Sequence, residues 1–113
     1  MLAVEELIHR IRAYQPTADA ELIKRAYDYS FRMHAGQMRK SGDPYFIHPA
    51  SVAGTIADLK LDTASVCAGL LHDVVEDTLA TTKDIEREFG DEIAQLVDGV
   101  TKLSKINFTS KED

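Results

Sequence analysis

Side chains that can bind a metal interrupt an apolar run in the middle of this 113-residue chain. His72 and Asp73 are adjacent, and a second acidic pair, Glu76 and Asp77, follows within one helical turn. His48 offers a further imidazole from a different segment. Imidazole and carboxylate groups together suit divalent manganese, iron or zinc, and such an ion turns a coordinated water into a nucleophile near neutral pH. The pattern predicts a metal-dependent hydrolase in which His48, His72 and Asp73 hold the ion.

The acidic pair has a second role in this interpretation. Glu76 and Asp77 are expected to orient water or to serve as acid and base. The simpler alternative is a polar helix face that only contacts solvent. The neighbouring Leu70, Leu71 and Val74 indicate a central helix, and acidic groups on such a helix are costly to bury unless they are paired or metal-bound. This cost weakens the simpler alternative, and the pattern alone leaves both interpretations open.

One helix, from about residue 63 to 76, is expected to carry all four polar side chains. At about 100° per residue they share one arc, whereas Cys67 and Leu70 fall on the opposite, core-facing side. Gly69 lies in the polar arc, where the missing side chain would leave space for a ligand or another backbone. Cys67 is expected to be a small buried residue and not a reactive thiol.

A basic loop, residues 37–47, precedes His48 and contains the glycine and proline of a turn. A guanidinium can stack on a base or pair with phosphate, and an ammonium and a hydroxyl add further anion contacts. An exposed loop that only contacts solvent is the alternative, but the nearby metal ligands favour an anion site. The side chains expected to bind the substrate are Arg39, Lys40, Ser41 and Tyr45.

The remaining segments also predict helices, at about residues 4–14, 17–35, 50–59, 81–89 and from 91 onward. The sequence therefore predicts an all-α bundle of five or six short helices without strands. In the helix after Pro49, the side chains expected to face inward are Val52, Ile56 and Leu59. The last helix has an apolar face formed by Ile93, Leu96, Val97 and Val100. Because no later segment covers that face, we expect residues 1–113 to be a single domain that lacks its C-terminal helices.

Composition excludes several classes of protein. The net charge of −6 argues against a nonspecific nucleic-acid binder, which needs a broad basic surface, but permits a small anionic ligand held by local cations. No apolar stretch approaches the roughly 20 residues of a membrane span. The single cysteine cannot form an internal disulfide, which suits a reducing cytoplasm. We therefore expect a cytoplasmic protein that contacts neither nucleic acid nor membrane.

Two long motifs resemble the Rel/Spo alarmone enzymes. Residues 34–49, HAGQMRKSGDPYFIHP, are similar to the signature loop of that family, and residues 70–78, LLHDVVEDT, resemble its His-Asp motif. Phe89-Gly90 and residues 100–103 also fit. The similarity covers nearly the whole chain, and both motifs occur in the family's order.

The resemblance implies an all-α HD-domain fold and a manganese-dependent enzyme that removes the 3′-diphosphate of guanosine tetraphosphate or pentaphosphate. It assigns His48, His72 and Asp73 to the metal and the acidic pair at 76 and 77 to catalysis. Arg39 matches the residue that packs on guanine, and the other three loop residues named above match positions around the nucleotide.

The resemblance also implies parts that lie outside these 113 residues. The family takes a further aspartate ligand from a later helix, so this chain alone is expected to bind metal poorly and to be inactive. Long family members carry synthetase and regulatory domains after the hydrolase. Two other functions stay open: a noncatalytic nucleotide-binding or regulatory module, and an HD phosphohydrolase for another nucleotide.

Overall fold

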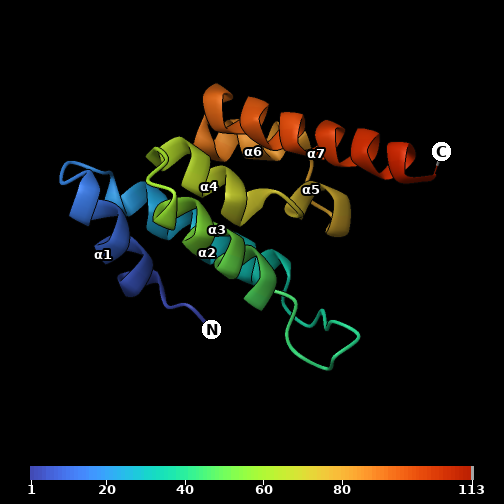
Figure 1. Cartoon of the computed structure of the whole chain (residues 1–113), viewed down its shortest axis with the longest axis horizontal. Helices are drawn as coiled ribbons and strands as arrows, with labels where there is room; N and C mark the ends of the chain where they lie inside the picture. The colour runs from blue at the N-terminus through green and yellow to red at the C-terminus, as the bar shows by residue number, and fades with distance from the viewer. Residues whose placement is uncertain (113) are drawn as a thin grey trace.

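The helix α4 (Thr63–Leu71) lies at the centre of the molecule and packs against α2, α3 and α7 (Figure 1). The computed structural model describes the backbone of residues 1–112 and the side chains of residues 1–102. Within the described backbone the only strand-like feature is an isolated antiparallel bridge between Met38 and Pro44. The all-α prediction is therefore confirmed. The other helices are α1 (Val4–Tyr14), α2 (Ala20–Met33), α3 (Ile47–Asp58), α5 (Val74–Asp77), α6 (Thr82–Phe89) and α7 (Asp91–Glu112).

The central helix is shorter than predicted. The expected single helix over residues 63–76 is two helices, because α4 ends at Leu71 and α5 begins at Val74. The described backbone consequently contains seven helices where five or six were predicted. The prediction that the four polar side chains share one arc of a helix is wrong for the same reason, because it assumed an unbroken helix from residue 63 to 76.

Polar caps fix the starts of three helices. The Asp19 carboxylate accepts a hydrogen bond from the Leu22 amide at the start of α2, and Asp62 accepts one from Ser65 at the start of α4. Thr81 forms a capping box with Asp84 at the start of α6. Each cap satisfies an amide that has no partner inside its helix. The predicted starts of α4 and α6 are confirmed, whereas α2 begins at Ala20, three residues later than predicted.

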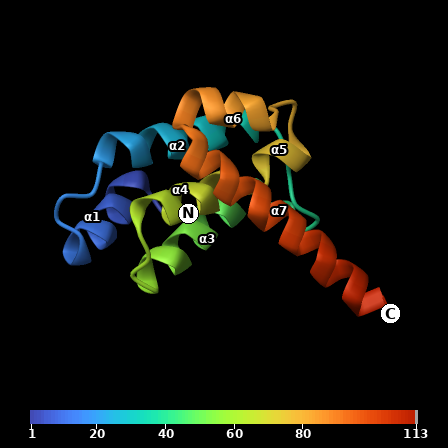
Figure 2. The ribbon, with the colours of Figure 1, turned by 90° about the horizontal axis from the view of Figure 1, so that it is seen from above.

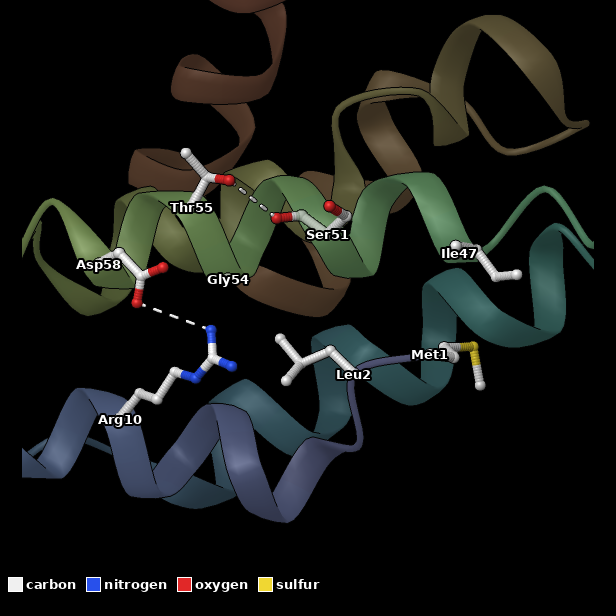
Figure 3. Close-up of a pocket in the computed structure, with 8 residues that line it drawn as sticks. All are labelled: Met1, Leu2, Arg10, Ile47, Ser51, Gly54, Thr55 and Asp58. Atoms are coloured by element: carbon white, nitrogen blue, oxygen red, sulfur yellow. Dashed lines mark hydrogen bonds and ion pairs between the residues drawn. The ribbon is translucent and has the colours of Figure 1, made fainter.

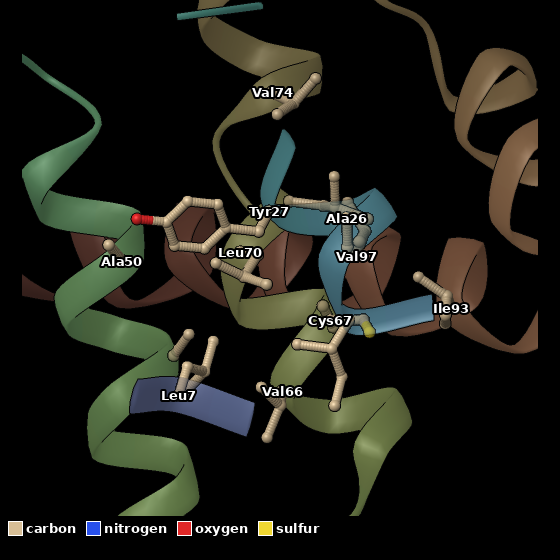
Figure 4. Close-up of a cluster of buried hydrophobic side chains, with 14 of the residues drawn as sticks. Leu7, Ala26, Tyr27, Ala50, Val66, Cys67, Leu70, Val74, Ile93 and Val97 are labelled. Atoms are coloured by element: carbon tan, nitrogen blue, oxygen red, sulfur yellow. The ribbon is translucent and has the colours of Figure 1, made fainter. Parts of the chain in front are cut away.

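In the core, apolar side chains of α2, α3 and α7 pack against α4 (Figure 4). Leu70 and Cys67 are fully buried, as the sequence predicted. Burial raises the pKa of the Cys67 thiol to about 12, because the thiolate would lose its solvation. Cys67 is therefore a packing residue. The apolar side chains in contact here include Leu7, Ala26, Tyr27, Ala50, Val66, Val74, Ile93 and Val97.

The inward face of α3 differs from the prediction. Leu59 is 66% exposed, and Val52 and Ile56 are only partly buried. The buried positions are instead small residues, namely Pro49, Ala50, Ala53, Gly54 and Ala57. The helix lies between α1 and α4, and small side chains let both approach closely. Hydrophobicity alone favoured the larger residues and missed this constraint.

Gly69 provides space for a neighbouring helix and not for a ligand. A Cβ atom at this position would lie 2.5 Å from Cδ1 of Ile56 and 3.6 Å from the Cα of Ala53, both on α3. Of the two alternatives raised by the sequence, the close approach of another element is the one observed. This contact holds the middle of α3 against the end of α4.

The apolar face of α7 is divided between the core and solvent. Ile93 and Val97 are buried against α4, whereas Leu96 and Val100 are 37% and 40% exposed. The sequence indicated that no later segment covers this face, and half of it is covered instead by the earlier helix α4. Figure 2 shows α7 crossing over α4 and then extending past the other helices. Neither α7 nor any other helix in the described part of the chain is apolar enough over sufficient length to cross a membrane.

The helix α1 supports α3 from the side away from α4. Arg10 pairs with Asp58 at 3.6 Å, and Gly54 accommodates Leu2, whose Cδ2 would lie 2.9 Å from an added Cβ (Figure 3). The hollow between the two helices has a volume of about 360 Å³. None of the predicted site residues lines it, so this hollow belongs to the scaffold.

Candidate metal centre

Three polar side chains from two helix ends converge at one point. His48 lies in the first turn of α3, while His72 and Asp73 follow the last residue of α4. Nε2 of His72 lies 3.1 Å from Oδ2 of Asp73, and Nε2 of His48 lies 3.5 Å from the same oxygen. One ligand atom from each residue lies within 4.8 Å of the other two. The structure thus brings together the three residues predicted to hold a metal.

The chain turns at His72 because its ring caps the end of α4. Nδ1 of His72 lies 2.6 Å from the carbonyl oxygen of Gly69. A carbonyl only accepts, so Nδ1 carries a proton and Nε2 is the ring nitrogen that faces Asp73. A continuing helix would offer the same carbonyl to the amide of Asp73, so the imidazole competes with helix propagation. The break in the helix and the orientation of this ligand have one cause.

The donor set fits a divalent cation. Two imidazole nitrogens and a carboxylate oxygen lie within 4.8 Å of one another, close enough to share one cation that would balance their lone pairs. A hydrogen bond from the second ring nitrogen of a ligand histidine to a carbonyl is the usual outer support of such a site. The bond from His72 to Gly69 provides this support.

The pKa values of the three groups reflect their contacts. Burial opposes ionisation of Asp73, but hydrogen bonds from His72 and Tyr45 outweigh it and lower the pKa of the carboxyl. Burial lowers the pKa of His48, and the neighbouring His72 and Arg39 act in the same direction. Burial opposes protonation of His72, yet its bonds to Asp73 and Gly69 raise the pKa of the ring. A proton and a metal ion therefore compete for the position between His72 and Asp73.

Tyr45 links the candidate ligands to the acidic pair. Its hydroxyl lies 2.7 Å from Oδ2 of Asp73 and 3.1 Å from Oδ2 of Asp77. Burial and these two carboxylates raise the pKa of the phenol, so it stays protonated and donates. A single hydroxyl proton is thus shared between two acidic side chains. The sequence predicted that Tyr45 lines a pocket but gave no sign of this bridge.

The two members of the acidic pair lie differently. Both are exposed on α5, but only Asp77 reaches the centre through Tyr45. Glu76 lines an adjoining groove of about 440 Å³, whose other walls include Arg32, Gln37 and Leu79. The predicted catalytic residues therefore lie at the rim of the centre, in contact with solvent.

The loop before α3 forms a closed strap, which we define as residues 37–45. The amide of Tyr45 donates to the carbonyl of Gln37 at 2.9 Å, and the amide of Arg39 donates to the carbonyl of Asp43 at 2.8 Å. Gly42 has a φ of 93°, a conformation that glycine adopts without strain. These bonds shape an exposed turn from backbone groups alone.

A groove of about 630 Å³ runs along the strap. Its lining residues are Met38, Arg39, Lys40, Ser41 and Tyr45. Four of these five are the predicted substrate-binding residues, and Tyr45 joins the groove to the metal centre. The Ser41 hydroxyl donates to Asp43 at 3.0 Å. A basic, open groove therefore ends at the candidate ligands.

Sequence reasoning missed one residue of this region. Gln37 donates from its side chain to the backbone carbonyl of Asp77 and contacts His34. His34 is the buried C-terminal cap of α2. The local sequence gave no sign of the role of Gln37, because its bond to Asp77 joins residues that are 40 positions apart along the chain.

Residues 26–113 match the sequence model of a family described as HD domain. The chain belongs to the HD domain family. All of the candidate ligands, the acidic pair and the strap lie within the matched residues. The HD-domain fold that the resemblance implied is therefore confirmed.

Several curated proteins are similar to this HD domain. A GTP pyrophosphokinase of Myxococcus xanthus is 56% identical over 97 residues, covering 86% of this chain and 13% of that protein. The GTP pyrophosphokinase rsh of Brucella ovis is 45% identical over 112 residues, covering 99% of this chain and 15% of that protein. A Synechocystis protein named probable guanosine-3′,5′-bis(diphosphate) 3′-pyrophosphohydrolase is 54% identical over 96 residues, 85% of this chain and 13% of its own length.

These relatives confirm the resemblance to Rel/Spo proteins. The chain spans about one seventh of the length of the relatives that it matches. The HD domain described here therefore corresponds to a small part of each of them.

Proposed function

We propose that this HD domain carries the centre of an enzyme that removes the 3′-diphosphate of guanosine tetraphosphate or pentaphosphate, releasing pyrophosphate and GDP or GTP. The observation that carries the proposal is the convergence of His48, His72 and Asp73 within 4.8 Å, at the end of a basic groove. The name of the Synechocystis relative, which is 54% identical, describes the same reaction.

The proposed metal is manganese, held by Nε2 of His48, Nε2 of His72 and a carboxylate oxygen of Asp73. When bound, such an ion lowers the pKa of a coordinated water to about 7 and so supplies a nucleophile at neutral pH. The Gly69 carbonyl keeps the His72 ring in the required tautomer. The Tyr45 hydroxyl holds the Asp73 carboxylate in place.

The proposed role of Glu76 and Asp77 is to orient the attacking water and to exchange protons with it. Both carboxylates are exposed, so protons can reach them from solvent. The contact of Asp77 with Tyr45 at 3.1 Å keeps one of them beside the centre. These positions favour acid–base roles over direct metal binding.

The proposed nucleotide lies along the strap. The Arg39 guanidinium packs on the guanine, while Lys40 and Ser41 contact phosphate oxygens. The volume of about 630 Å³ is in the range of ligand sites. Because the net charge of the chain is −6, the local positive charges of Arg39 and Lys40 are what attracts an anionic substrate. Tyr45, at the inner end of the groove, would contact the part of the nucleotide nearest the metal.

The test is pyrophosphate release from guanosine tetraphosphate with manganese, with and without a chelator. The proposal expects metal-dependent release that His72→Ala and Asp73→Ala each abolish. His9→Ala and Asp28→Ala are matched controls, because both residues are exposed and lie on α1 and α2. Unchanged release in either ligand variant would contradict the proposal.

Two further measurements separate the alternative functions. A noncatalytic module would bind guanosine tetraphosphate in calorimetry without turnover. An HD phosphohydrolase for another nucleotide would prefer a different base, which a panel of guanine and adenine nucleotides detects.

We also propose that the working hydrolase domain extends beyond residue 113, where a further aspartate completes the metal site. The assay is therefore run on this chain and on a longer natural protein that contains it. Activity confined to the longer protein supports this extent, and equal activity of both contradicts it. The buried free thiol of Cys67 suits the proposed cytoplasmic location.

A further inference from the structure

The side chain of Gln37 connects two elements that flank the metal centre. Its Nε2 donates to the backbone carbonyl of Asp77 at 2.6 Å, and its Oε1 lies 2.9 Å from Nδ1 of His34. Its backbone carbonyl accepts the bond from Tyr45 that closes the strap. Gln37 thus joins the end of α2, the strap and the end of α5.

The chemistry of the three groups fixes the direction of each bond. The Asp77 carbonyl can only accept, so the amide nitrogen of Gln37 faces it and the amide oxygen faces His34. That oxygen also only accepts, so Nδ1 of His34 carries the ring proton. In the neutral ring, Nε2 then carries the lone pair. The two hydrogen bonds run in one direction: His34 donates to Gln37, and Gln37 donates to Asp77.

His34 also supports the centre from a second direction. Its ring is 2% exposed and lies against the ring of Tyr45, with centroids 4.9 Å apart and an angle of 33° between the planes. Tyr45 in turn contacts Asp73 and Asp77. The buried His34 ring therefore supports two residues. It packs on Tyr45, which bridges Asp73 and Asp77, and it bonds to Gln37, which holds the end of α5.

The helix α5 needs such an external support. It has four residues, and a single turn has little stability of its own. Carbonyls at a helix C-terminus have no partner inside the helix, and the bond from Gln37 satisfies that of Asp77. The direction in which Glu76 and Asp77 project therefore depends on what holds this end.

We propose that His34 and Gln37 are positioning residues that fix the acidic pair relative to the strap and the metal ligands. Neither is a predicted ligand of the metal or a predicted contact of the nucleotide. The inference rests on the proposed hydrolase function and adds two residues that act on it through Asp77 and Tyr45. It predicts that loss of either residue slows the chemical step more than it weakens binding.

The first test is Gln37→Ala. A displacement of α5 by about 1 Å is expected to lower kcat by about 10- to 100-fold, while KM and metal affinity change by less than about threefold. Gln95→Ala is the matched control, since that amide bonds to Asp91 on α7. A kcat of Gln37→Ala within twofold of the parent, or a loss in metal affinity that equals the loss in kcat, overturns the inference.

The second test compares two changes at His34. The amide nitrogen in His34→Asn can donate to Gln37 from about the position of Nδ1, whereas His34→Leu cannot donate. We expect the asparagine variant to retain about tenfold more activity than the leucine variant. Because the two residues act in series, the double variant His34→Leu with Gln37→Ala should be no slower than the slower single variant. Equal activity of the two His34 variants, or fully multiplicative losses in the double variant, contradicts a shared role.

A third measurement does not depend on activity. Nitrogen NMR of the His34 ring should report the proton on Nδ1 in the parent chain and a changed tautomer population in Gln37→Ala. A proton on Nε2 in the parent overturns the inference even if the enzyme is active. If no nucleotide is hydrolysed by the parent, the proposed function fails instead, while the NMR result still decides whether the His34–Gln37–Asp77 connection exists.

Discussion

The helix α4 and the strap both present side chains to the metal centre, but they are held in different ways. Residues 66–71 of α4 are all buried and are packed by three other helices. Strap residues 38–44 are all exposed and are shaped by backbone hydrogen bonds. Two of the proposed ligands, His72 and Asp73, thus follow a rigid, close-packed helix, and the proposed nucleotide contacts come from an adaptable loop. Metal geometry tolerates little displacement, whereas a groove can adjust to its ligand.

The largest effect on stability is expected from the packed region. Leu70→Ala should lower the free energy of unfolding by about 3 kcal/mol, because the cavity under α4 cannot collapse fully. Leu59→Ala removes the same group at a position that is 66% exposed and serves as the control. Denaturant unfolding measures both variants. Equal losses in the two would contradict the contrast between packed and exposed positions.

Metal binding should stabilise the rigid region. An ion at about 100 times its dissociation constant is expected to raise the free energy of unfolding by about 2.7 kcal/mol, since only the folded chain assembles the ligands. Thermal unfolding with and without manganese measures this. The stabilisation should disappear in His48→Ala and persist in Lys40→Ala. Its persistence without His48 would remove that imidazole from the ligand set.

Tyr45, which connects the strap to the metal centre, is expected to have an intermediate effect, on metal affinity. Tyr45→Phe keeps the ring against His34 but removes the hydroxyl that supports Asp73. Metal affinity should fall by about tenfold, as for other groups that orient a ligand. Calorimetric titration with manganese provides the value. If affinity does not change, the bridge has no part in holding the carboxylate.

The smallest effect on stability is expected from the strap. Lys40→Ala should change the free energy of unfolding by less than about 0.5 kcal/mol, because the side chain is exposed. Its effect should appear in nucleotide binding, which we expect to weaken about tenfold through loss of one charge-assisted hydrogen bond. If the folded Lys40→Ala variant binds guanosine tetraphosphate normally, Lys40 does not contribute to nucleotide binding.

Much of this arrangement could be predicted because its signals are local. The boundaries of α1 follow from apolar spacing and from Pro16 after its end, and those of α6 follow from Thr81 and Gly90 at its ends. Burial of Cys67 and Leu70 follows from the central apolar run. The residue types at positions 48, 72 and 73 suggested a metal site before their distances were known. For the helix boundaries and the buried run, the physical cause acts within one or two helical turns.

The errors occur where distant contacts outweigh local preference. Leu59 is exposed although it is more hydrophobic than the alanines that α3 buries, because two neighbouring helices leave no room for large side chains. Residues 72 and 73 have a helical pattern, yet the His72 ring takes the Gly69 carbonyl and the helix breaks. A wheel drawn through that break could not place Glu76 and Asp77 correctly.

By itself, the sequence determined an all-α chain with two imidazoles, a neighbouring carboxylate and a basic loop. Only the tertiary structure decided that the three ligand atoms lie within 4.8 Å and that Tyr45 connects them to Asp77. It alone also joined Gln37 to α5 across 40 residues of chain. Composition and spacing fix which groups are available, but packing of distant helices fixes their distances, and the strength of coordination and hydrogen bonding depends on those distances.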